Sequence, residues 1–122
     1  MADDPVRFLP LSAQQFHILL ALTDADRHGY GVIQDVEQRT GGDMRPGTGT
    51  LYTAIARLVA LGLIGETGRE DERRRFYRLL PLGRAVLQAE THRLEALVRH
   101  AHARGVRTPI PGRPAPAGPR RS

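Results

Sequence analysis

Few side chains in this sequence are of types that carry chemistry. There is no cysteine, which excludes thiolate metal sites and thiol nucleophiles. The five histidines form no ligand pattern; His100 and His102, two residues apart, point to different faces of a helix. There is no nucleophile–base pair or paired carboxylate. The segment Gly47-Thr48-Gly49-Thr50 lacks the lysine of a phosphate-binding loop. We expect neither an enzyme nor a protein with a metal or other cofactor.

The polar face of one predicted helix, 49–61, is the main candidate site. Leu51, Ile55 and Leu58 form a narrow apolar stripe on this helix. The opposite face is small and polar with one arginine, and it consists of Thr50, Thr53, Arg57 and Ala60. An α-helix fits the major groove of B-DNA, where base edges differ in their donors and acceptors. The pattern therefore predicts a DNA-contacting surface.

Two helices and a loop must position that face. Apolar spacing predicts a helix over about 12–23 with Ser12 as N-cap, and a second over about 29–40 that Gly41-Gly42 ends. The loop 44–48 is rich in turn residues, and Thr48 is expected to cap the helix 49–61. Three short helices with tight connections indicate a helix-turn-helix core.

A β-hairpin is predicted after this core. Residues 63–67 and 75–79 resemble strands on either side of the polar run 68–74. Tyr77 and Leu79 share one face by the period of two, and we expect that face on the core. A helical core followed by a hairpin is the layout of a winged helix.

A long helix is predicted over 81–103, with Pro81 in its first turn. Its seam, broken at Glu90, consists of Leu87, Leu94, Leu97 and Ala101. The helix extends well beyond a short hairpin, so the simplest partner for much of the seam is the same helix of a second copy. We therefore expect a homodimer.

Charge is concentrated at the C-terminal end. The chain of 122 residues fits one domain and carries a formal charge of +5, yet residues 1–103 are neutral. We predict an N-terminal arm at 1–10, a winged helix-turn-helix at 11–80, a dimerisation helix at 81–103 and a disordered basic tail at 104–122. Neither a signal peptide nor a membrane span is recognised, which favours the cytoplasm.

Several motifs in order resemble the PadR family of transcriptional regulators. They include His28-Gly29-Tyr30-Gly31, Gly49-Thr50-Leu51-Tyr52 and Pro81-Leu82-Gly83, within a match over about 11–103. Leu80 stands where the family usually has a capping threonine. The resemblance implies a mainly α protein with a small β-hairpin, in which a winged helix-turn-helix precedes a long dimerisation helix. A single C-terminal helix is similar to the compact subgroup.

Each candidate DNA contact has a structural alternative. Thr48 supplies a hydroxyl to the DNA or only caps the helix. Gly49 lets the protein backbone approach the DNA backbone closely. Thr50 and Thr53 present hydroxyls to phosphate or base edges, and Thr53 is the best candidate for a base contact. Tyr52 reaches a phosphate or only lines the core edge. Arg57 pairs with phosphate or guanine, or is only solvated.

Tyr30, which the resemblance implies, and the arginines of the predicted hairpin, or wing, are further candidate DNA contacts. Tyr30 packs under the recognition helix, which we favour slightly, or contacts phosphate. Arg73, Arg74 and Arg75 contact phosphate or the minor groove, or pair with Glu70, Asp71 and Glu72.

The predicted function is that of a homodimeric, sequence-specific repressor of a double-stranded DNA operator. The resemblance implies release by a small-molecule effector, which the sequence does not identify. Two alternatives remain: a winged-helix module for protein association, compatible with the neutral charge of 1–103, and an architectural DNA binder with little sequence preference that depends on its arginine tail.

Overall fold

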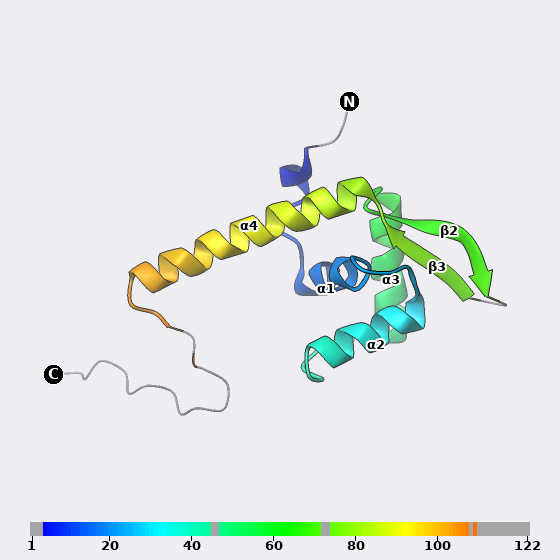
Figure 1. The fold of residues 1–122 in the computed structure, drawn as a ribbon, viewed down its shortest axis with the longest axis horizontal. Helices are drawn as coiled ribbons and strands as arrows, with labels where there is room; N and C mark the ends of the chain where they lie inside the picture. Colours follow the sequence, from blue (N-terminus) through cyan, green and yellow to red (C-terminus); the bar gives the residue numbers. More distant parts are fainter. Residues whose placement is uncertain (1–3, 45–46, 72–73, 108, 110–122) are drawn as a thin grey trace. The chain divides into compact units, whose positions relative to one another are not determined.

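The computed structural model describes residues 4–44, 47–71, 74–107 and 109. The chain divides into two compact units, 1–91 and 92–122, with the division inside the last helix. The expected boundary at residue 81 therefore differs from the observed one. In chain order, the elements are a 3₁₀ turn (Pro5–Phe8), α1 (Ala13–Ala21), β1 (Arg27–His28), α2 (Gly29–Arg39), α3 (Thr48–Ala60), β2 (Ile64–Asp71), β3 (Arg74–Leu79) and α4 (Pro81–Ala103) (Figure 1).

Capping interactions set the start of the first two helices. The Ser12 hydroxyl accepts the Gln15 amide, and the Gln15 side chain accepts the Ser12 amide, so α1 begins in a reciprocal capping box. The ring of His28 accepts the Gly31 amide and caps α2. Gly41 and Gly42 follow α2 with φ of 61° and 86°, a conformation that favours glycine. The expected Ser12 cap and glycine stop are both confirmed.

The sheet has three antiparallel strands in the order β1-β3-β2. The hairpin of β2 and β3 was expected, and Ile64 pairs with Leu79 in its register. Both strands extend into the run 68–74, which was expected to be a loop; residues 72–73 lie outside the described part. The short β1 was missed, because two residues carry no strand pattern of their own. Its His28 pairs with Phe76.

The core lies between the three helices and the sheet. Tyr77 is buried and Leu79 packs against the core, as expected from their shared face. Phe76, on the other face of β3, is also buried because the His28 ring meets it edge-on, with centroids 5.5 Å apart. The largest fully buried apolar side chains are Ile18, Leu19, Val32, Val36, Leu51, Ile55, Leu58, Leu63, Ile64 and Val86.

The first turns of α4 are fixed to the start of β2. A Cβ on Gly83 would lie 2.0 Å from the Leu63 carbonyl oxygen, so only glycine permits this approach. Leu80 donates its amide to the same oxygen at 3.0 Å. The bounds predicted for α4 are confirmed, and its N-terminal half belongs to the winged unit.

Glu90 explains the break in the seam of α4. Its side chain is 1% exposed, and Oε2 accepts the Leu11 amide at 2.8 Å. A buried carboxylate needs such a partner, so Glu90 serves the chain's own core. Phe8, Leu9 and Leu11 also pack against this core, and thus the expected N-terminal arm is anchored at its end. Most of the expected basic tail lies outside the described residues.

Candidate nucleic-acid interface

Three buried side chains fix the orientation of α3. Leu51, Ile55 and Leu58 are almost fully excluded from solvent. Burial of each such side chain stabilises the folded state by about 1.5–3 kcal/mol, so rotation of the helix about its axis would lose this free energy. Thr50, Thr53 and Arg57 are exposed on the remaining surface. The predicted division of α3 into an anchored and an exposed face is confirmed.

The start of α3 differs from the prediction. Gly47 is the N-cap and makes no side-chain hydrogen bond, while Thr48 is the first helical residue. The expectation that Thr48 caps the helix is therefore wrong: its backbone has already entered the helix. The first amides of a helix have no intrahelical acceptor. Gly47, Gly49 and Thr50 are exposed and Gly47 supplies no side-chain cap, so these donors remain available to an anion such as phosphate.

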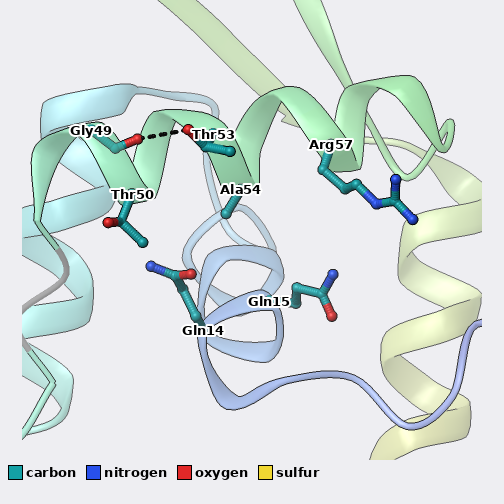
Figure 2. Close-up of a pocket in the computed structure, with 7 residues that line it drawn as sticks. All are labelled: Gln14, Gln15, Gly49, Thr50, Thr53, Ala54 and Arg57. Carbon is teal, nitrogen blue, oxygen red and sulfur yellow. Dashed lines mark hydrogen bonds between the residues drawn. The ribbon is translucent and has the colours of Figure 1, made fainter.

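The two exposed threonine hydroxyls differ in what they can do. Thr53 donates its hydroxyl proton to the Gly49 carbonyl at 3.0 Å, within the helix (Figure 2). Its oxygen can still accept, and the residue is exposed. The Thr50 hydroxyl has no hydrogen bond to any described residue, and neither does the Arg57 guanidinium. These two side chains are therefore free to donate to a ligand.

An open groove runs beside the exposed face of α3. Its volume is about 740 Å³, and its lining consists of Gln14, Gln15, Gly49, Thr50, Thr53, Ala54 and Arg57. Figure 2 shows Thr50 and Arg57 on the side of α3 that faces α1. Sequence reasoning missed Gln14 and Gln15. The Ser12–Gln15 spacing signals a helix start, but nothing in the sequence indicates that α1 lies against the candidate face.

The two tyrosines proposed from the sequence are both exposed. Tyr52 lies at the edge of the core, as expected, with its ring against Gly29: a Cβ there would lie 2.4 Å from Cε1 of Tyr52. Tyr30 is 58% exposed, so the favoured expectation that it packs under the recognition helix is wrong. Gly29, rather than Tyr30, occupies that contact. The exposure of Tyr30 leaves a phosphate contact as its candidate role.

The wing arginines are only partly described. Arg73 lies outside the described residues, and Arg74 begins β3, where it pairs with Asp71 in the strand register. The Arg75 guanidinium is exposed and lies 3.4 Å from the Glu66 carboxylate. Its described ion-pair partner is therefore Glu66 on β2, while in the strand register Arg75 pairs with Glu70, whose side chain lies outside the described part. An exposed ion pair of this kind is weak, so Arg75 remains able to contact phosphate.

Other arginines near the sheet and helices are engaged in the fold. Arg78 donates to both carboxylate oxygens of Asp26, and this hydrogen bond and charge raise the pKa of Arg78. Arg27 donates to the Ala21 carbonyl at 2.7 Å. Arg39 donates to Asp35 and to the carbonyl and ring nitrogen of His17. These three residues are poorer candidates for DNA contacts than Arg57.

The four seam residues of α4 have different environments. Leu87 is 6% exposed in its own subunit's core, so it is not free to form a dimer contact as expected. Leu94 and Leu97 are exposed, and Ala101 is half-buried. Val98, which was not predicted, is also exposed. The apolar surface of α4 that can meet a partner thus begins at Leu94.

The described part of the chain contains neither a cluster of metal-ligating side chains nor a membrane-spanning helix. No group of three or more histidine, aspartate or glutamate side chains there is placed to hold a metal ion. None of the described helices is long and apolar enough to cross a membrane.

The fold and the exposed face of α3 define a winged helix-turn-helix protein of the DNA-binding class. Residues 18–89 match the transcriptional regulator PadR-like family, and the chain belongs to this family. It is accordingly a transcriptional regulator and not an enzyme.

The chain is also similar to individual proteins, two of which are transcriptional regulators. The chain is 36% identical over 90 residues to the transcriptional regulator Rv3488 of Mycobacterium tuberculosis, covering 72% of this chain and 81% of that protein. It is 40% identical over 83 residues, 68% of its length, to an uncharacterized 37.1 kDa protein of a Streptomyces fradiae transposon, of which it spans only 23%. A solved transcriptional regulator of Clostridium thermocellum superposes with a TM-score of 0.67 and 26% identity, over 88% of this chain and 99% of that one.

Proposed function

We propose that this regulator is a homodimer that binds a specific double-stranded DNA operator through α3. The observation that carries the proposal is the exposed set Thr50, Thr53 and Arg57 on a helix fastened by Leu51, Ile55 and Leu58. Exposed hydroxyls and one guanidinium on a helix of this width match what the major groove offers. Free amides at the start of α3 and the hydroxyls of Tyr30 and Tyr52 supply phosphate contacts.

Exposed apolar residues on α4 support the dimer. Leu97 is 50% exposed and Val98 49% exposed, and Leu94 lies one turn before them. Burying these side chains against a second α4 removes apolar surface from water. A two-fold dimer presents two copies of α3, so the operator is pseudo-palindromic with half-sites about 34 Å apart.

Repression and its release by a small molecule rest on the family alone. We infer that the dimer occupies a promoter and that an effector of unidentified structure lowers its affinity for DNA. Such a protein acts where the chromosome is, in the cytoplasm. In a reconstituted transcription assay, the purified protein should reduce transcript from a template carrying its operator.

Selection of bound fragments from the host's genomic DNA tests the proposal. We expect enrichment of a pseudo-palindromic sequence, bound with an affinity that falls steeply with salt because phosphate contacts release counterions. Absence of salt-dependent binding would favour a protein-association module instead. A chain truncated after residue 103 should keep its site preference. Loss of all binding on truncation would favour an architectural binder that depends on the arginine tail.

A further inference from the structure

The groove between α1 and α3 holds one glutamine side chain that no hydrogen bond ties to the described residues. Gln14 lies in the first turn of α1 and lines the groove. Figure 2 shows its carboxamide extending toward Thr50 of α3. It has no hydrogen bond to any described residue and is half-buried. A half-buried amide that makes no hydrogen bond to the described residues, beside an exposed face of α3, is placed to bind a ligand.

Its neighbour Gln15 has a different role. The Gln15 Oε1 accepts the Ser12 amide at 3.0 Å and forms half of the capping box. That bond orients the Gln15 side chain along its own helix and ties it to the start of α1. The two adjacent glutamines therefore separate into a capping residue and a residue with free hydrogen-bonding groups.

The lining of the groove indicates its occupant. A volume of about 740 Å³ falls in the range of small-molecule pockets, so size alone does not distinguish a small organic ligand from DNA. Pockets for organic ligands are lined mostly by apolar and aromatic side chains. The described lining of this groove contains no aromatic ring; its apolar surface comes from Ala54 and from the alkyl parts of the threonine, glutamine and arginine side chains. Amides, hydroxyls and a guanidinium in an open groove suit the polar edge of a nucleic acid better.

We propose that Gln14 contacts a base edge of the operator, so that specificity is shared by α1 and α3. Glutamine can pair with adenine through the N6 donor and the N7 acceptor in the major groove. The N-terminal end of a recognition helix lies closest to the bases, and Gln14 extends toward Thr50 at that end of α3 (Figure 2). This inference rests on the proposed function, because it requires α3 to enter the groove of DNA.

Binding measurements on the full chain test the role of Gln14. The probe is a fluorescent duplex recovered by selection from a randomised library, together with duplexes in which each base pair is changed in turn. Gln14→Ala is compared with Gln88→Ala, since Gln88 is an exposed glutamine on α4 outside the groove. Thermal unfolding of both variants checks that α1 still folds. The salt dependence of binding is measured for each protein.

The expected result is a loss of about 5- to 100-fold in affinity for Gln14→Ala, with discrimination lost at one base pair of each half-site. Its salt dependence should equal that of the wild type, because an amide displaces no counterion. Gln88→Ala should bind as the wild type does. Wild-type discrimination at every base pair in Gln14→Ala would overturn the inference while leaving the proposed function intact. Failure of the wild type to select any sequence would instead refute the proposed function.

Discussion

The ring of Tyr52 lies directly over Gly29, where α3 meets the start of α2. A Cβ on Gly29 would lie 2.4 Å from Cε1 and 2.5 Å from the hydroxyl oxygen of Tyr52. Real Cβ atoms do not come so close, so the ring would have to move. Because Tyr52 is partly exposed, it can swing outward. The glycine thus sets where the tyrosine hydroxyl is presented.

Gly29→Ala should weaken DNA binding more than it changes stability. Alanine gains about 0.5–1 kcal/mol over glycine within a helix, which offsets part of the cost of moving the ring. Loss of a tyrosine–phosphate hydrogen bond should reduce affinity about tenfold, as measured by fluorescence anisotropy. Gly31→Ala is the matched control, because a Cβ there meets its nearest neighbour at 3.5 Å, an ordinary contact. Equal affinities of the two variants would exclude this role of Tyr52.

Gly49→Ala should separate stability from DNA binding. Gly49 lies in the first turn of α3 without a left-handed φ, and a Cβ there would meet nothing within 4 Å. Nothing in the chain therefore requires glycine, and alanine should stabilise the protein by about 0.5–1 kcal/mol. The added methyl group would obstruct close approach of a phosphate, so we expect at least about a tenfold loss of affinity, or ~1.4 kcal/mol. A higher melting temperature with undiminished affinity would contradict close approach at Gly49.

His17 should make stability depend on pH. Burial and the nearby Arg39 guanidinium lower the pKa of His17, against the opposing effect of Asp35. Arg39 approaches Nδ1 of His17 at 2.9 Å, and a guanidinium has only donors, so this nitrogen accepts and the ring is neutral.

The lowered pKa of His17 makes the folded state less stable at acidic pH, because the unfolded chain then binds the proton more readily. As the pH falls, His17 of the unfolded chain takes up a proton near pH 6.5, whereas the folded chain does so only at a lower pH. The contribution of His17 to the free energy of unfolding is therefore complete above pH 6.5. It is lost as the pH falls from about 6.5 through the lower pKa of the folded state. Urea unfolding at a series of pH values should show this decline in the wild type and a smaller one in His17→Gln. Identical pH profiles would refute the effect.

Leu97→Glu should dissociate the proposed dimer. The charge would have to be buried against the second α4, which is costly without a partner. Sedimentation at micromolar concentration should give a monomer, with reduced affinity for a two-half-site duplex. Gln88→Glu adds the same charge at another exposed position of the same helix and should remain dimeric. A dimeric Leu97→Glu would show that this part of α4 is not the interface.

Periodicity predicted the architecture because it reflects burial. The stripe of Leu51, Ile55 and Leu58 correctly predicted both the helix α3 and its buried face, and Pro81 correctly predicted the start of α4. The sequence could not show contacts made between elements. The two residues of β1 form a strand only because Phe76 and Tyr77 of β3 pair with them.

Candidate residues were misplaced for the same reason. Leu87 and Leu94 occupy equivalent seam positions, and only tertiary packing buries the first and exposes the second. Tyr30 was assigned to the contact that the smaller Gly29 makes. The partly buried Gln14 has no distinguishing sequence context, and its place in the groove depends on the packing of α1 against α3.

Arg57 offers the most direct test of DNA binding by the exposed face of α3. Affinity for the selected duplex should be measured against salt concentration for the wild type, Arg57→Ala and Arg99→Ala, an exposed arginine on α4. Arg57→Ala should bind more weakly. If Arg57 contacts phosphate, the slope of log affinity against log salt should also decrease by about one. Arg99→Ala should match the wild type. Wild-type affinity and slope in Arg57→Ala would contradict the account.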